Sequence, residues 1–163
     1  DNTNRTEARY WIDDFLRVRQ RQDNYHNTHN TLAMCKKYVT KHLSKEFEVS
    51  KADQAELLNE TMKYFQEQES FSMDDFSEKV IRQPEVVESF TRFRQEYEQD
   101  RDIRIEDEFG ISDSAVKKQA RSYKSVIKLD RNFHIYVHGN RNLLEQGEDE
   151  KGKFYKVYYE EEE

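Results

Sequence analysis

The sequence has one cysteine, one proline and only four glycines among 163 residues. A single cysteine excludes an internal disulfide bond and favours a reducing compartment. The scarcity of proline and glycine argues against a low-complexity linker. No run approaches the roughly 20 consecutive apolar residues that a transmembrane helix needs, so no membrane association is expected.

Apolar residues are also few, because the hydrophobic fraction is 34% and the charged fraction is 37%. Average domains contain about 45–50% apolar residues when glycine is counted. Ten phenylalanines and ten tyrosines partly compensate for this shortage of apolar residues, since each aromatic ring buries a large area. The composition predicts a folded chain with a thin core, and an elongated shape or a partner that covers part of it.

The net charge of -7 is unevenly distributed along the chain. Residues 1–45 carry a net charge of +4, residues 46–115 carry -12, residues 116–142 carry +6 and residues 143–163 carry -5. One basic block therefore interrupts an acidic chain. Its cations are Lys117, Lys118, Arg121, Lys124, Lys128, Arg131 and Arg141.

The first part of the chain has a helical pattern from Trp11 to Leu43, where apolar or large side chains recur every three or four positions. Residues 24–31 are rich in asparagine and threonine, which have poor helix propensity. The pattern predicts one long helix, or two helices broken near Asn27. The side chains expected to be buried are Trp11, Phe15, Leu32, Val39 and Leu43.

Three further helix starts are predicted from the local sequence. Ser50 with Asp53 and Ser72 with Asp75 have the spacing of capping residues. Pro84 fits the first turn of another helix. The inward faces of these helices are predicted to carry Ala55, Leu58, Met62, Phe65, Met73, Phe76, Val80, Val86, Phe90, Phe93 and Tyr97.

The periodicity changes after Gly110. Ser112 or Asp113 is expected to cap a short helix, and residues 126–129 and 133–137 alternate like two strands of a hairpin. Residues 154–159 predict a third strand after a loop at 147–152. The predicted fold class is α+β: a mainly helical region at 1–110, then a short helix, a small antiparallel sheet of about three strands and an acidic tail at 111–163, in one compact unit.

Sequence motifs for catalysis or metal binding are missing. His26, His29, Cys35 and His42 lie close together in the sequence, but no second cysteine or helical His-x-x-x-His pair completes a zinc site. The chain has no nucleophile elbow and no phosphate-binding glycine loop. We therefore expect no enzyme activity, no metal and no cofactor.

The predicted hairpin is the part of the basic block with the most distinctive pattern. Strand alternation places His134, Tyr136 and His138 on the face opposite Phe133, Ile135 and Val137. This polar strip is either a ligand-facing surface or an ordinary solvent-exposed face. Cations on a short helix and a hairpin suit contacts with nucleic-acid phosphates.

Residues 111–159 read ISDSAVKKQARSYKSVIKLDRNFHIYVHGNRNLLEQGEDEKGKFYKVYY. This segment resembles the C-terminal end of the bacterial nucleoid-associated protein family, the NdpA/YejK-like group, in the branch found in Bacteroidetes. The resemblance implies a cytoplasmic protein of the bacterial nucleoid that associates with DNA and has no enzyme activity and no cofactor. Because members of that family are longer, we expect this chain to be a C-terminal portion.

Two functions are compatible with the sequence. The first is a DNA-binding nucleoid protein that contacts phosphates non-specifically through the basic block, with His134, Tyr136 and His138 on the same surface. The second is a protein–protein interaction or dimerisation domain. In that case the acidic helical half would bind a basic partner, or the helical seam would pair two copies.

Overall fold

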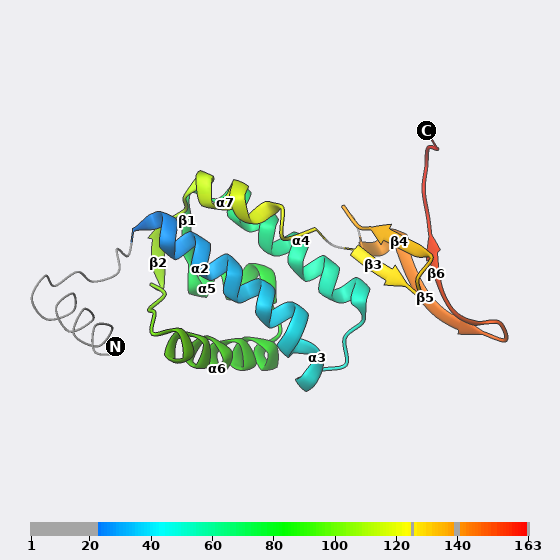
Figure 1. Ribbon diagram of the computed structural model, residues 1–163, viewed down its shortest axis with the longest axis horizontal. Coiled ribbons are helices and arrows are strands. Elements are labelled where there is room, and N and C mark those ends of the chain that lie inside the picture. Colours follow the sequence, from blue (N-terminus) through cyan, green and yellow to red (C-terminus); the bar gives the residue numbers. More distant parts are fainter. Residues whose placement is uncertain (1–22, 125, 139–140, 163) are drawn as a thin grey trace, which may run out of the picture.

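The computed structural model describes residues 23–124, 126–138 and 141–162. Helices occupy most of the molecule, and two β-hairpins lie together at one end of it (Figure 1). The mixed helical and β composition confirms the coarse fold class. The sheet differs from the prediction, because each described sheet has two strands and none has three.

The first described helix is nearly continuous across three segments: α2 (Asn24–Lys37), the π-helical turn η2 (Tyr38–His42) and α3 (Leu43–Glu46). Asp23 caps its start, because the carboxylate accepts the backbone N–H of His26 at 3.0 Å. The helix runs through Asn27 without a break. Leu32, Val39 and Leu43 are buried as predicted; Trp11 and Phe15 lie outside the described residues.

The predicted helix starts are confirmed. Ser50 and Asp53 form a reciprocal capping box at the start of α4 (Lys51–Glu67). Ser72 accepts the backbone N–H of Asp75 at the start of α5 (Met73–Phe76), which continues into η3 (Ser77–Ile81). Pro84 opens α6 (Pro84–Arg101). The inward-facing side chains predicted for these helices are buried, apart from Met73, which is partly buried.

An aromatic cluster forms the centre of the core. Phe71 lies in β1 (Ser70–Ser72) and pairs in antiparallel register with Phe109 of β2 (Glu108–Gly110). Their rings stack at 4.8 Å between centroids, and the Phe65 ring stacks on Phe71 at 5.3 Å. The sequence did not predict this strand pair, because each strand has only three residues and its partner lies far along the chain.

The C-terminal part begins with α7 (Asp113–Ala120) and continues into β3 (Val126–Leu129) and β4 (Phe133–Tyr136), which form the predicted hairpin. After η4 (Arg141–Leu143) follows a second antiparallel hairpin of β5 (Leu144–Asp149) and β6 (Gly152–Val157). The predicted loop at 147–152 is wrong, since residues 147–149 belong to β5 and only the turn intervenes.

Gly147 explains why β5 was missed. Glycine is a weak strand residue, yet here a side chain on Gly147 would meet the Phe154 ring, which lies across the backbone at this position. A Cβ atom would stand 2.4 Å from Cζ of Phe154. The glycine therefore makes room for a ring on the opposite strand and does not end the strand.

A second, smaller apolar cluster joins the hairpins to α4. Ala52 and Ala55 in the first turns of α4 are buried against Ile127, Val137 and Leu144. The Asn59 side-chain amide, also on α4, donates to the Val137 carbonyl oxygen at 3.2 Å. The small alanines let the strands approach the helix closely, so the start of α4 positions the hairpins.

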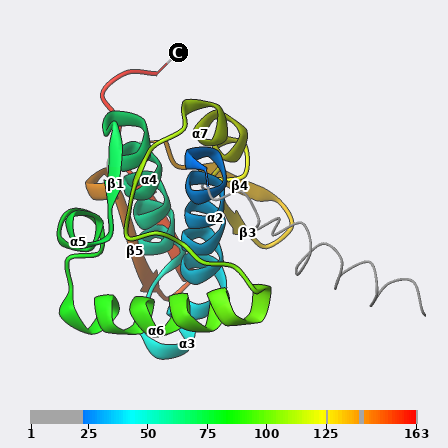
Figure 2. The same ribbon diagram turned by 90° about the vertical axis from the view of Figure 1, so that its left-hand side faces the viewer.

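The helices are layered about α2 and α4. Figures 1 and 2 both show α7 on one side of this pair and α6 on the other, while β3 to β6 lie beyond the end at which α4 begins. Within the described residues, no helix combines the length and the apolar character needed to cross a membrane.

The position of Phe71 yields a stability prediction. Replacing Phe71 by alanine is expected to lower the free energy of unfolding by about 3–5 kcal/mol, because the substitution leaves a cavity among stacked rings. Denaturant unfolding measures the change. Phe133→Ala, which removes a ring that is 64% exposed, is the matched control and should change stability by less than about 0.5 kcal/mol. Equal losses in the two variants would contradict this assignment of the core.

Candidate nucleic-acid interface

Helix α7 presents its cations to solvent because its opposite face is buried. Ala115 and Val116 pack into the core, whereas Lys117 and Lys118 are exposed. Arg121 follows the helix and is also exposed. Helical geometry thus separates a small apolar face from a cationic one within eight residues.

Polar contacts fix α7 against α2. The backbone N–H of Ser112 donates to the Thr28 hydroxyl at 3.0 Å, and the Gln119 amide lies 2.9 Å from Nδ1 of His29. Beyond the helix, the buried Tyr123 hydroxyl donates to the Leu32 carbonyl oxygen. Ser112 occupies the N-cap position, but its own hydroxyl contacts Ser114 instead of the helix backbone. These contacts hold the cationic face of α7 outward.

The β3–β4 hairpin carries the next cations. Lys128 is exposed on β3, and Arg131 is exposed in the turn that joins the strands. Lys124 is exposed as well, but it precedes β3, which begins at Val126. Asp130 enters the turn with φ 50°, a left-handed conformation that aspartate tolerates.

The polar strip predicted on β4 faces solvent. His134, Tyr136 and His138 are all exposed, while Ile135 is partly buried and Val137 is buried. Phe133 keeps the predicted side of the strand, since it pairs with Leu129 as Ile135 pairs with Ile127, but its ring is 64% exposed. The reason is its position at the tip of the hairpin, beyond the apolar cluster that covers Ile127 and Val137.

Arg141 is the first residue of η4, and its side chain lies outside the described part of the structure. The other six cations of the basic block are described, and every one of them is exposed. They follow one another along α7, the segment after it and the β3–β4 hairpin.

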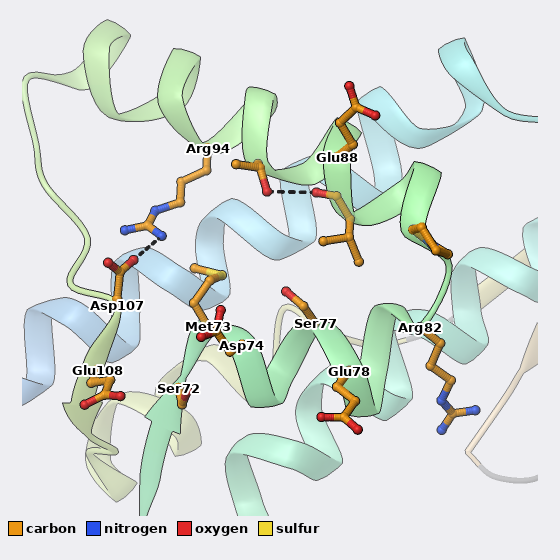
Figure 3. A pocket seen from close by; sticks show the side chains of 13 residues that line it. Ser72, Met73, Asp74, Ser77, Glu78, Arg82, Glu88, Arg94, Asp107 and Glu108 are labelled. Atoms are coloured by element: carbon orange, nitrogen blue, oxygen red, sulfur yellow. Dashed lines mark hydrogen bonds and ion pairs between the residues drawn. The ribbon is translucent and has the colours of Figure 1, made fainter.

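The acidic middle of the chain forms a groove of about 710 Å³ between α5, η3, α6 and β2 (Figure 3). We call it the acidic groove. Five carboxylates and two guanidinium groups line it, so its lining is negative overall. These charged residues are Asp74, Glu78, Arg82, Glu88, Arg94, Asp107 and Glu108.

Arg94 lines this groove and forms hydrogen bonds with three other residues. Its guanidinium group donates to Asp107 at 2.6 Å, to the Ile105 carbonyl oxygen at 2.5 Å and to Glu98 at 3.4 Å. Glu98 in turn accepts the backbone N–H of Ile105 at 2.6 Å. Figure 3 shows Arg94 reaching across to Asp107. The network ties α6 to the segment that leads into β2.

The basic block and the acidic groove lie on different parts of the molecule. The groove is formed by α5, η3, α6 and β2. Of these elements, α6 lies on the other side of α2 and α4 from α7, and the β3–β4 hairpin lies at the far end of the molecule (Figures 1 and 2). An anion that approaches the β3–β4 hairpin is therefore at the opposite end of the molecule from the groove.

The histidine and cysteine residues near α2 do not meet as a metal site. The described residues contain no group of three or more His, Cys, Asp or Glu side chains placed to hold an ion. Cys35 is buried in the core, and burial raises the pKa of its thiol. His42 contacts Glu46 at 2.7 Å, and His29 contacts Gln119.

Sequence reasoning missed one prominent property of the C-terminal region. All of the exposed large apolar side chains in the described residues lie between positions 133 and 159. These side chains are Phe133, Tyr136, Leu143, Phe154, Val157, Tyr158 and Tyr159. The sequence shows where aromatic residues occur, but their exposure depends on which face the small apolar cluster covers.

Architecture and charge together define a mixed helical and β protein with a basic block on α7 and the β3–β4 hairpin and an acidic groove along α6. The family model described as nucleoid-associated protein YejK matches residues 1–162. The chain belongs to this family, and the match extends the resemblance of residues 111–159 over nearly the whole sequence. Searches of curated proteins and of solved structures each returned no match.

The junction of α7 with α2 yields a pH prediction. Burial, then Lys118 and His26, hold the pKa of His29 below its usual value of 6.5. The unfolded chain therefore takes up this proton at higher pH than the folded chain does, and the folded state loses stability as the pH falls through 6.5.

Replacing His29 by glutamine should weaken this loss, since glutamine does not titrate. The measurement is denaturant unfolding of the parent and of His29→Gln, above and below pH 6.5. The same pH dependence in both proteins would show that other groups are responsible.

Proposed function

We propose that this nucleoid-associated chain binds DNA without sequence preference, through phosphate contacts from the basic block. The single observation that carries the proposal is the exposure of all six described cations of the block along α7 and the β3–β4 hairpin. The family supports it, because its members are nucleoid-associated proteins. A location in the bacterial nucleoid follows from the same family membership.

The rigidity of the surface supports phosphate binding. Contacts from Ser112, Gln119 and Tyr123 fix α7 on α2, and the small apolar cluster fixes the hairpin on α4. Cations held on secondary structure lose less conformational freedom on binding than cations on a free tail. The candidate contacts are Lys117, Lys118, Arg121, Lys124, Lys128, Arg131 and Arg141, with His134, Tyr136 and His138 on the adjacent strand.

The separation of charge supports the same function. A duplex is a dense line of negative charge, and a nearby acidic surface would repel it. α6, one wall of the acidic groove, lies on the other side of α2 and α4 from α7. The net charge of -7 is thus compatible with DNA binding at one surface.

The proposal predicts a salt-dependent effect of two lysines. Changing both Lys124 and Lys128 to alanine should weaken binding to all duplex sequences alike. It should also reduce the slope of log affinity against log salt by about 1.8, since each lost phosphate contact removes about 0.9. Fluorescence anisotropy titrations at several salt concentrations measure both effects.

The matched control changes Lys63 and Lys79, two exposed lysines outside the basic block, to alanine. Lys79 lies 2.8 Å from Asp75 beside the acidic groove. This variant has the same net charge as the first and should bind as the parent does. If the two double variants behave alike, or if the parent shows no salt-dependent binding, phosphate binding by the basic block is wrong.

As a second candidate function we propose self-association through the β5–β6 hairpin. Val157 and Tyr158 are about half exposed, and only Leu144 and Tyr155 of this hairpin join the small apolar cluster. A two-stranded hairpin alone is marginally stable in water, so a further contact would stabilise it. Its tip extends away from the helices (Figure 1).

The occupant that best fits this hairpin is a second copy of the chain. A two-fold interface places the same surface on both subunits, so the surface must be complementary to itself. In the antiparallel register Glu145 lies opposite Lys156 and Glu148 lies opposite Lys153, and Lys156 contacts Glu145 at 3.6 Å. These four charges balance within one hairpin, so they would not repel a second copy, and the exposed Val157 and Tyr158 supply the apolar contact.

Sedimentation velocity tests this second function. The parent should form a dimer with increasing concentration, and Val157→Asp should shift it toward the monomer, because a carboxylate replaces an apolar contact. Lys63→Asp, on the exposed side of α4, is the control and should leave the equilibrium unchanged. A parent that remains monomeric at all concentrations would exclude self-association.

A further inference from the structure

The outer face of the β3–β4 hairpin combines a cation with aromatic and imidazole rings. In the antiparallel register Lys128 lies opposite His134, and Val126 lies opposite Tyr136. Directly opposed residues share a face of the sheet, so Lys128, His134 and Tyr136 project to the same side. All three are exposed.

The rings of this face are arranged as parallel planes. Tyr136 and His138 are two residues apart, and their rings lie at 6.4 Å between centroids with an interplanar angle of 6°. Tyr136 is 57% exposed. Ile135 on the other face of β4 and Val137 just after the strand pack in the apolar cluster on α4, which fixes the strand and hence the direction of the rings.

Phosphate binding alone does not explain why aromatic rings are exposed on this face. Phosphates are contacted by cations and hydrogen-bond donors, whereas an exposed aromatic face offers its area to a flat apolar surface. Bases in a duplex stack on one another and leave no face free. Bases of a single strand do have free faces, and proteins that bind single strands combine a cationic path with aromatic stacking platforms.

We propose that the outer face of β3–β4 binds single-stranded DNA, with an unpaired base stacked on Tyr136 and neighbouring phosphates contacted by Lys124 and Lys128. This inference rests on the proposed DNA-binding function and specifies its preferred substrate. His138 lies parallel to Tyr136 and extends the stacking surface along the strand. Duplex DNA uses only the phosphate contacts, so an unpaired strand gains a further interaction.

The test compares three ligands of equal length in anisotropy titrations with the full chain: a thymidine oligonucleotide, its abasic counterpart and a duplex. Tyr136→Leu keeps an apolar side chain but removes the ring. It should weaken binding of the thymidine strand by about 5- to 150-fold, the range for loss of one stacked base. The abasic strand and the duplex should lose much less affinity than the thymidine strand does, because neither offers an unpaired base to the ring.

Two further variants complete the design. Tyr136→Phe keeps the ring and should bind the thymidine strand as the parent does, which separates stacking from loss of the hydroxyl. Tyr159→Leu removes a ring that is 69% exposed but lies after β6, and it should have no effect. Unchanged melting temperatures confirm that the variants are folded.

The outcomes distinguish the two proposals. If the parent binds duplex with the expected salt dependence but Tyr136→Leu binds the thymidine strand normally, stacking is wrong and phosphate binding stands. Equal weakening of all three ligands by Tyr136→Leu also overturns stacking. If the parent binds none of the ligands, both proposals are wrong.

Discussion

Phe71 lies where rings from several parts of the chain meet, and this aromatic cluster compensates for a small supply of apolar residues. Its neighbours Phe65, Phe76 and Phe109 come from α4, α5 and β2. Phe90 of α6 continues the contacts from Phe76. Because only 34% of the residues are hydrophobic, a few large rings connect α4, α5 and α6 with the β1–β2 pair. The charged residues are then left for the surface.

The C-terminal region has a different construction. Only a few of its side chains are buried, in the small cluster with Ala52 and Ala55 at the start of α4. Its remaining faces carry both the cations and every exposed large apolar side chain of the described residues. The helical part thus serves as a stable base, and the interactions proposed for this nucleoid-associated family member concentrate on α7 and the two hairpins.

Local sequence was sufficient for much of the fold. The capping residues Ser50 and Ser72, the proline that opens α6 and the alternation in β3 and β4 each act through neighbours within a few residues, so their pattern identifies the element. Local sequence failed at β5, where Gly147 accommodates the Phe154 ring of another strand. Local sequence predicted the face of the strand on which Phe133 lies but not the exposure of its ring, which lies beyond the cluster that buries its neighbours.

The sequence by itself determined the starts of α4, α5 and α6, the inward faces of these helices, the basic block and the family. Only the tertiary structure decided that β1 pairs with β2 and that α7 lies across α2 and α4 from α6, which lines the acidic groove. It also decided that Tyr136 and His138 share an exposed face beside Lys128. The physical reason is the distance along the chain over which each interaction acts. Caps and periodicity depend on residues within a turn or two, whereas exposure and the separation of charge depend on which distant segments pack together.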